Sequence, residues 1–386
     1  MLTTTTTLND VNATLTRGGH PQDRPANELL DRYEMILQEK RLNWTTHMRL
    51  TKLLGRGGQG VVYLTERRGA DNFTLPVAMK IFAPDRYVDA RTYDEAMCRI
   101  ARVASLVAQI QHDNLLDVHN FVDRDRIRIM VMEWVDGYDL SQLLVPTMLE
   151  RVKTRVSARR WEYINSVIVT AGPIHPRIKP GVAVAIVRDC LSALAALHRE
   201  GIVHGDVKPS NIMLKRTGNA KMVDIGSAFE LASPPPARTC TPAYAAPELL
   251  EGTDCTPRSD LASLGYVLIE LLAGRPLFAG LNNCRDLLEA KRHLPQRLLQ
   301  VLPEEVTVNE LLMSFCRGLI APDPMRRFPS AEAADLRKEG AAAFQRQLVI
   351  GDLAAEYGNE IRLWVEELKE LDEHEEGQAM NGPLVG

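Results

Sequence analysis

The chain has 386 residues, of which 45% are hydrophobic and 25% are charged. This balance is typical of a globular protein and excludes collagen-like, fully disordered and membrane-embedded classes. The formal net charge of -4 provides no overall basic field, so we expect no nucleic-acid partner.

Cysteine usage and the apolar runs indicate the cellular setting. The six cysteines are scattered and form no C-x-x-C pair, which argues against a zinc ribbon, a dithiol redox motif or a disulfide scaffold. We therefore expect a reducing compartment, the cytoplasm. The longest apolar runs are short or interrupted by a charge, so we expect neither a signal peptide nor a membrane-spanning helix.

The first third of the chain predicts a small, sheet-rich unit. Residues 1–26 are rich in Thr, Asn, Gly and Pro without any period and predict a disordered arm. Within residues 27–47, apolar side chains recur at helical spacing up to residue 42, which predicts a helix and a linker. Four strands and one helix are then expected; the strands are 48–54, 61–65, 77–82 and 127–133, and the helix is 91–111.

The rest of the chain predicts a larger, helical unit. After Gly137 the pattern changes to helices punctuated by glycine and proline, and it continues to about residue 346. Such a change favours an α+β protein with a sheet-rich lobe followed by a helical lobe. Residues 347–386 predict a helical, acidic tail, with its helix over 353–371.

A glycine-rich segment precedes the second strand. Gly55, Gly57 and Gly60 form a G-x-G-x-x-G motif, but residues 61–64 continue as a strand. A dinucleotide site would need a helix there, so the motif predicts a hairpin tip that can close over phosphates, with an ordinary turn as the alternative. Lys80, at the end of the next apolar strand, shifts the balance toward a nucleotide site.

Three further motifs carry the chemistry. They are HGDVKPSN at 204–211, VDIG at 223–226 and TPAYAAPE at 241–248. In this order and spacing the motifs resemble those of the eukaryotic-type (bacterial Hanks-type) serine/threonine protein kinases, over about residues 48–346. The resemblance implies a two-lobe protein kinase fold, with a β-rich N-lobe over 48–135 and a helical C-lobe over 136–346 that contains an insert at 144–180.

The resemblance also implies a site that uses ATP and Mg²⁺. Phosphoryl transfer needs in-line positioning and cancellation of negative charge more than covalent chemistry by the protein. The resemblance makes Asp206 the acceptor of the substrate hydroxyl proton, Lys208 a contact of the γ-phosphate and Lys80 the anchor of the nucleotide phosphates. It makes Asn211 and Asp224 the magnesium ligands, in agreement with the oxygen ligands that this cation prefers.

A wider set of residues is implied to bind the nucleotide. Met132 takes the gatekeeper position, and the backbone of Glu133 and Val135 is expected to pair with adenine. For the apolar members, plain core packing is the alternative to contact with the base. The full set is Leu54, Gly55, Gly57, Gly60, Val62, Ala78, Lys80, Met132, Glu133, Val135 and Met213.

The later motifs bear on the substrate. Lys208 and Thr241 resemble serine/threonine kinases rather than tyrosine kinases. A protein substrate is favoured, because a small-molecule phosphotransferase is not expected to carry the 241–248 motif or its pairing of Glu248 with Arg327. Asp260 is expected to hold the catalytic loop from a buried helix.

One departure from the family pattern concerns the activation segment. Gly205 stands where many members carry an arginine, which normally needs a phosphorylated activation-segment residue as its partner. We therefore expect activity to depend less on such phosphorylation.

A second departure concerns the partner of Lys80. Counting back from His112 puts Val103 where the family carries a glutamate that pairs with this lysine, and Glu95 serves only if the helix runs longer. The apolar residues that follow Val103 at helical spacing favour this register, so the usual lysine–glutamate pair is expected to be absent. A nucleotide-binding pseudokinase scaffold is therefore the alternative to an active kinase.

Two charged segments lie outside the motifs. Residues 151–180 are strongly basic and residues 366–376 strongly acidic. Such runs are commonly solvated faces. Substrate docking and contact between insert and tail are the alternatives, and a regulatory protein is a candidate partner at the termini or at the 144–180 insert.

Overall fold

The computed structural model describes Leu15–Thr16 and residues 28–39, 41–43, 47–69, 71–236, 239–350 and 357–380. Apart from Leu15–Thr16, the arm expected over residues 1–26 lies outside these ranges, as does part of the linker before residue 47. The described pair in the arm forms β1 (Leu15–Thr16), which is antiparallel to β15 (Thr239–Cys240).

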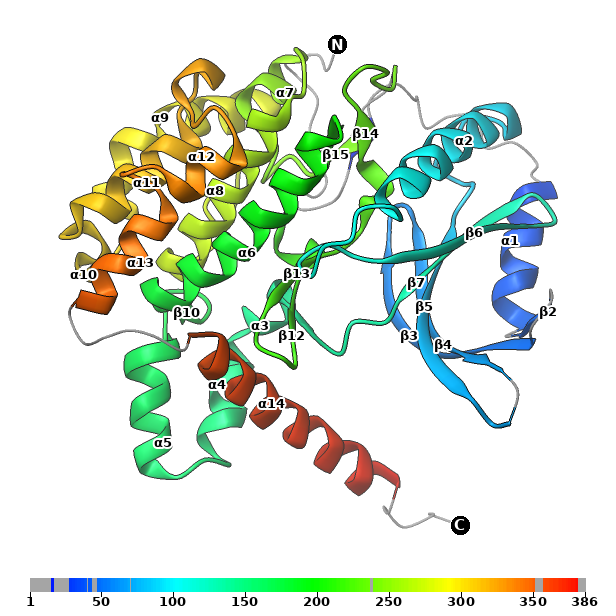
Figure 1. Ribbon diagram of the computed structural model, residues 1–386, viewed down its shortest axis with the longest axis horizontal. Coiled ribbons are helices and arrows are strands. Elements are labelled where there is room, and N and C mark those ends of the chain that lie inside the picture. The colour runs from blue at the N-terminus through cyan, green and yellow to red at the C-terminus, as the bar shows by residue number, and fades with distance from the viewer. Residues whose placement is uncertain are drawn as a thin grey trace.

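The chain folds into a sheet-rich N-lobe and a larger helical C-lobe, which stand side by side in Figure 1. The antiparallel sheet of the N-lobe has the strand order β2-β3-β4-β5-β7-β6. The α+β, two-lobe expectation is therefore confirmed. The elements of the N-lobe are α1 (Glu28–Glu39), β2 (Arg41–Asn43), β3 (His47–Gly57), β4 (Gly60–Arg68), β5 (Thr74–Phe82), α2 (Ala90–Val107), β6 (Val118–Arg124) and β7 (Ile127–Glu133).

Most of the C-lobe consists of helices joined by short strands. Its first half contains β8 (Gly137–Asp139), α3 (Leu140–Leu143), α4 (Pro146–Lys153), α5 (Ala158–Tyr163), η1 (Ile164–Ile168), β9 (Val169–Thr170), β10 (Arg177–Ile178), α6 (Pro180–Arg199), β11 (Ile202–Val203), η2 (Pro209–Asn211), β12 (Ile212–Lys215), β13 (Ala220–Met222), η3 (Ile225–Ser227) and β14 (Phe229–Glu230). Its second half contains α7 (Pro247–Glu251), α8 (Pro257–Ala273), α9 (Cys284–Val301), α10 (Glu304–Thr307), α11 (Glu310–Ile320), η4 (Pro324–Arg326), α12 (Ala331–Leu336), α13 (Ala341–Ile350) and α14 (Tyr357–Met380).

The glycine-rich segment is the turn between β3 and β4. Gly57 and Gly60 face each other in the ladder, so Gly58 and Gln59 form the tip of a hairpin, as predicted. Gly60 has φ +139°, and a Cβ there would lie 2.0 Å from the carbonyl oxygen of Ile81 in β5. Only glycine fits this close approach, so the position fixes the hairpin against the lysine-bearing strand.

Helix α2 confirms a helix in the predicted region but is shorter than the expected 91–111. The Asp89 side chain accepts a hydrogen bond from the Thr92 backbone, and the Thr92 side chain accepts one from the Asp89 backbone, forming a capping box. Val103 and Val107 are buried on its core face. Strand β6 was not predicted, because its side chains are mostly half-buried or exposed and carry little apolar alternation.

Helices α6 and α8 form the centre of the C-lobe. Every residue of α8 from Ser259 to Ala273 is buried, as expected for the helix that carries Asp260. Helix α6 (Pro180–Arg199) is long and apolar enough to cross a membrane by length and composition, but 72% of that apolar window is buried inside the lobe. Its hydropathy is therefore accounted for by its place in the core.

The C-terminal helix α14 packs against the insert, lying below the C-lobe beside α4 in Figure 1. The expected helix over 353–371 is observed later, at Tyr357–Met380. Arg160 Nε of α5 lies 2.6 Å from Glu367 Oε1, and Arg151 of α4 pairs with Asp372. For Arg151 and Arg160 the structure therefore shows contact between the basic insert and the acidic tail instead of a solvated face. Arg155 and Arg159 of the insert are exposed.

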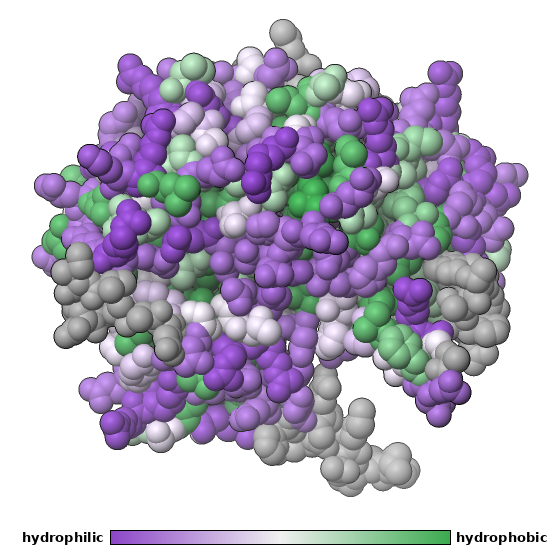
Figure 2. Space-filling view, viewed as in Figure 1, coloured by the Kyte–Doolittle hydropathy of each residue, from purple (hydrophilic) through white to green (hydrophobic). Residues whose placement is uncertain are grey.

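The surface shown in Figure 2 is mostly hydrophilic, with hydrophobic residues in scattered groups. The apolar side chains are instead collected inside, in a core that runs through both lobes and includes Trp364 of α14. The tail helix therefore belongs to the packed body of the protein.

A buried ion pair joins α7 to the loop after η4. The guanidinium of Arg327 donates from both terminal nitrogens to the carboxylate of Glu248, at 2.7 Å each. Ser259 Oγ donates to the same carboxylate at 2.7 Å. The predicted pairing of Glu248 with Arg327 is confirmed.

We predict that Arg327→Ala will strongly destabilise the protein, because it leaves the Glu248 carboxylate buried without its charge partner. The loss expected in urea unfolding is about 3–5 kcal/mol. Glu95→Ala, which breaks the exposed pair with Arg91, is the matched control and should change stability little. Equal losses in the two variants would contradict a special role for the buried pair.

Candidate active site

A buried carboxylate fixes the loop that carries Asp206. Asp260 of α8 accepts hydrogen bonds from the backbone nitrogens of His204 and Gly205, at 2.9 Å each. Asp260 Oδ2 also lies 2.9 Å from His198 Nε2 on α6. The loop is therefore held by the two central helices, as expected for Asp260.

Asp206, Lys208 and Thr241 form a compact cluster. Lys208 Nζ lies 2.8 Å from Asp206 Oδ2, and the Thr241 hydroxyl donates to Asp206 Oδ1 at 2.7 Å. Lys208 Nζ also donates to Thr241 Oγ1 at 3.0 Å. A hydroxyl group thus already lies on the carboxylate, in the arrangement that a serine or threonine of a substrate would need.

Asn211 and Asp224 are the candidate metal ligands, and each keeps one side-chain oxygen for that role. Asn211 Nδ2 donates to the Asp206 carbonyl oxygen at 2.8 Å, which leaves Oδ1 as the possible ligand atom. At Asp224, the bonds from Lys80 and from the Gly226 backbone both use Oδ1, which leaves Oδ2. Two protein oxygens fit Mg²⁺, which commonly takes one or two protein ligands together with substrate phosphates and water.

Lys80 joins the two lobes at this point. Its Nζ atom, on β5, forms an ion pair with Asp224 of the C-lobe, and the lysine is 3% exposed. Burial raises the pKa of Asp224, but the charge of Lys80 and the hydrogen bonds from Lys80 and Gly226 outweigh it and lower the pKa to about 2. The carboxylate is therefore ionised throughout the neutral range.

As expected, helix α2 supplies no glutamate to pair with Lys80. Val103 is buried on the core face of α2, and Glu95 points to an exposed pair with Arg91. The second acceptor of Lys80 is instead Gln59, whose Oε1 lies 2.6 Å from Nζ. Sequence reasoning missed Gln59, because the family motif leaves that position of the glycine-rich turn unspecified.

The hinge that joins the lobes, residues 131–137, differs from expectation at the backbone N–H of Glu133. Glu133 ends β7, and its N–H donates to the Asp117 carbonyl oxygen at 3.0 Å, so this N–H is not available to adenine. No described residue hydrogen-bonds the backbone of Val135. The Glu133 side chain is held by Lys221 of β13, a buried lysine that the sequence did not mark as part of the site.

The remaining predicted nucleotide residues lie on the elements around this hinge. Ala78 and Met132 are cross-strand partners in β5 and β7, and both are buried. Val62 and Met213 are half-buried, whereas Leu54 is exposed at the outer end of β3. The glycine-rich hairpin contributes the other positions, Gly55, Gly57 and Gly60.

The activation segment, residues 224–248, contacts the N-lobe through an ion pair that the sequence did not reveal. Arg102 Nε of α2 lies 2.6 Å from Glu230 Oε1 in β14. Gly205, the expected departure, has φ +76°, and a Cβ there would lie 3.0 Å from the Ser227 carbonyl oxygen. The backbone conformation at this position therefore favours glycine, the residue that also removes the arginine charge.

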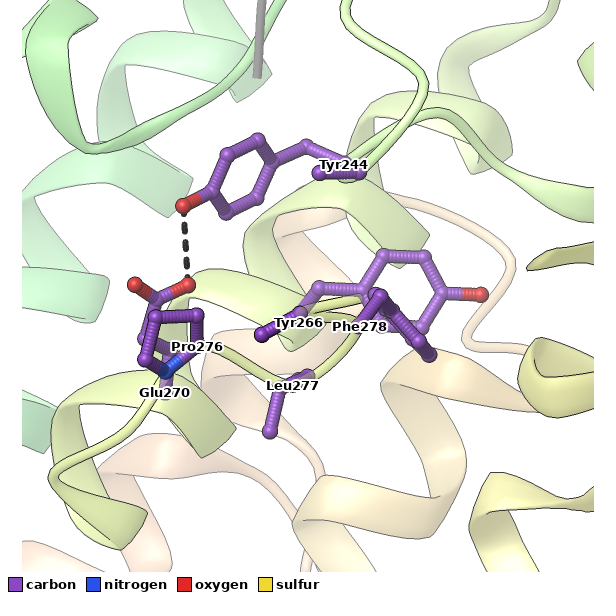
Figure 3. Close-up of a pocket in the computed structure, with 8 residues that line it drawn as sticks. Tyr244, Tyr266, Glu270, Pro276, Leu277 and Phe278 are labelled. Carbon is purple, nitrogen blue, oxygen red and sulfur yellow. Dashed lines mark hydrogen bonds between the residues drawn. The ribbon is translucent and has the colours of Figure 1, made fainter. Parts of the chain in front are cut away.

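A small pocket of about 80 Å³ lies beside the segment that follows Thr241. Figure 3 shows aromatic and acidic side chains around it, and the Tyr244 hydroxyl donates to Glu270 Oε2 at 2.8 Å. The fully buried Lys291 lies against the rings of Tyr266 and Phe278, which line the pocket, and donates to the Ala243 carbonyl oxygen at 2.6 Å. The pocket and the catalytic cluster thus share one segment of chain.

Comparisons with known proteins agree with this geometry. The protein kinase domain family matches residues 48–336. The serine/threonine-protein kinase PrkC of Bacillus subtilis is 30% identical over 326 residues, covering 83% of this chain and 43% of PrkC. PkaA of Streptomyces coelicolor is 31% identical over 246 residues, covering 60% of this chain and 39% of PkaA. The chain therefore spans less than half the length of these relatives.

The chain belongs to the protein kinase family. Its similarity to PrkC and PkaA further assigns it to the bacterial Hanks-type serine/threonine protein kinases.

We predict that the Lys80–Asp224 pair stabilises the fold above about pH 4. The pKa of Asp224 is about 2 in the folded state and about 3.9 in an unfolded chain, so the stabilisation is lost as the pH falls through the folded pKa. The difference in unfolding free energy between wild type and Asp224→Asn should be constant from pH 5 to 8 and fall to roughly half by pH 3. Urea titrations at these pH values would contradict the assignment if the difference grew in acid.

Proposed function

We propose that this chain transfers the γ-phosphate of ATP to serine or threonine hydroxyls of a protein substrate. The observation that carries the proposal is the cluster of Asp206, Lys208 and Thr241, in which a threonine hydroxyl already donates to the Asp206 carboxylate. Such a carboxylate can orient an incoming hydroxyl and accept its proton.

Each part of the reaction has a residue of this chain. Lys80 binds the nucleotide phosphates from the N-lobe, and Lys208 neutralises charge on the transferred group beside Asp206. Asn211 Oδ1 and Asp224 Oδ2 would hold Mg²⁺, which supplies further neutralisation of phosphate charge when bound. The backbone of Val135, which no described residue hydrogen-bonds, is proposed to pair with adenine.

The alternative is a non-catalytic, nucleotide-binding scaffold. It rests on the missing helix glutamate, which in this family normally positions Lys80. It is weakened by the two acceptors that Lys80 has here, Asp224 and Gln59, and by the complete set of catalytic and metal-binding side chains.

A protein substrate and a cytoplasmic location complete the proposal. The pocket lined by Ala243, Tyr244 and Glu270 adjoins Thr241, so residues that flank a phosphoacceptor can contact it. All six cysteines are free thiols, which supports a reducing compartment.

The deciding experiment is Asp206→Asn in an assay for transfer of labelled phosphate to a generic basic protein. We expect transfer to fall at least about 100-fold while nucleotide affinity and melting temperature are kept. Asp71→Asn, in the exposed turn between β4 and β5, is the matched control. A wild-type protein that binds nucleotide but transfers no phosphate would favour the scaffold, and Asp206→Asn with near wild-type transfer would remove Asp206 from its role.

We further propose that α14 is the site through which a regulatory protein acts. Lys369 Nζ lies 2.6 Å from Oδ2 of Asp136, a residue of the hinge. The same helix contacts the basic insert through Glu367 and Asp372. A partner that binds the insert or α14 would therefore alter the ion pair between Lys369 and Asp136 that connects α14 to the hinge.

The contact with the hinge can be tested by Lys369→Met. Breaking a partly exposed ion pair is worth roughly 0.2–1 kcal/mol, so the KM for ATP should rise up to about fivefold with kcat nearly unchanged. Arg362→Met removes a pair with Glu366 inside α14 itself and should leave KM unchanged. Equal KM values for the two variants would contradict coupling between α14 and the hinge.

A further inference from the structure

Lys80 needs a second acceptor, and helix α2 does not supply one. A buried ammonium group is costly unless hydrogen bonds and opposite charge compensate it. The acids of α2 are Asp94 and Glu95, and both bond arginines: Asp94 lies 2.6 Å from Arg126, and Glu95 lies 2.9 Å from Arg91. The helix therefore has no carboxylate left for the lysine.

Gln59, at the tip of the glycine-rich hairpin, is the second acceptor of Lys80. Its Oε1 accepts from Lys80 Nζ at 2.6 Å, and its Nε2 donates to Ser227 Oγ at 2.8 Å. Its backbone oxygen accepts from the Ala83 nitrogen at 3.0 Å, which fixes the tip to the end of β5. Both ends of the amide are thus occupied, so its orientation is defined.

The segment after Asp224 is shaped to receive this amide. A Cβ at Gly226 would lie 2.0 Å from Gln59 Oε1 and 2.8 Å from Lys80 Nζ. Any larger residue would push the amide away from the lysine. In this chain, the absence of a side chain at Gly226 therefore makes room for the amide of Gln59.

We propose that Gln59 is the positioning residue of Lys80 and replaces the helix carboxylate. This inference rests on the proposed function. Because an ammonium group has three protons, Gln59 and Asp224 use two of them and leave the third for a nucleotide phosphate. Through its bond to Ser227, the same amide connects the glycine-rich hairpin to the segment after Asp224, so that closure of the hairpin and placement of Lys80 occur together.

The amide is neutral, and this distinguishes it from the usual carboxylate. Lys80 keeps more of its positive charge uncompensated, so its attraction for phosphate is stronger than in a lysine–glutamate pair. The acceptor oxygen is what positions the lysine. A carboxylate at residue 59 keeps the acceptor oxygen but adds a negative charge, so its nucleotide affinity should lie between those of the wild type and the alanine variant.

The test measures the dissociation constant of Mg²⁺-ADP together with KM and kcat for ATP. Losing a hydrogen bond to a charged group should weaken Mg²⁺-ADP binding by about tenfold or more in Gln59→Ala. Gln59→Glu should stay within about threefold of wild type. Gln109→Ala, which removes an exposed glutamine bonded to Ser105 at the end of α2, is the matched control and should bind as wild type does.

The action through Lys80 is tested in the Lys80→Met background. If Gln59 acts only by holding the lysine, Gln59→Ala should cause less than about a twofold further loss of Mg²⁺-ADP affinity there. A full additional loss would overturn the proposal, as would tighter nucleotide binding by Gln59→Ala, which would make the amide a competitor of the phosphates. Gln59→Glu as weak as Gln59→Ala would also contradict it.

Failure of this inference can be told from failure of the proposed function. Mg²⁺-ADP binding reports on Gln59 even if the wild-type protein transfers no phosphate. A wild-type protein that binds no Mg²⁺-ADP would overturn both proposals.

Discussion

The buried charge of Lys80 is the constraint around which the site is arranged. An ammonium group at 3% exposure requires acceptors, and the chain supplies them from two directions. Asp224 comes from the C-lobe and Gln59 from the hairpin of the N-lobe. Because these acceptors are on different lobes, compensating one charge brings together the glycine-rich hairpin, the strand that carries Lys80 and the segment around Asp224.

Buried contacts in the C-lobe hold the loop that carries Asp206 and the end of the activation segment in place. Asp260 binds two backbone nitrogens of the catalytic loop from a helix that is buried along almost its whole length. The ion pair of Arg327 with Glu248 holds the end of the activation segment to the same region. Catalytic geometry is therefore set by contacts deep in the lobe, while Lys80, Gln59 and the hinge lie where the lobes meet.

The tail also packs against the C-lobe, although the match to the protein kinase domain family ends at residue 336. Helix α14 buries Trp364 and Leu368 and reaches the hinge through Lys369. Glycine at residue 218 allows the approach, since a Cβ there would lie 1.8 Å from the Gly358 carbonyl oxygen. The tail is thus fitted to the C-lobe in shape as well as in charge.

Much of the molecule was predictable from the sequence. The motifs around Asp206 and Asp224 predicted the two-lobe fold, which is confirmed, and the candidate catalytic residues, which stay a prediction, because phosphoryl transfer requires particular side chains at those positions. Apolar periodicity placed Val103 in the helix core and so predicted that the helix glutamate is missing, since the buried face of a helix follows directly from the spacing of its apolar residues. The partners of side chains distant in sequence were decided only by the tertiary structure. Separate elements pack together and bring three such pairs into contact: Gln59 with Lys80, Arg102 with Glu230, and Lys369 with Asp136. A local sequence pattern shows which side chains can form a hydrogen bond or ion pair, but it does not show which of them the folded chain brings within bonding distance.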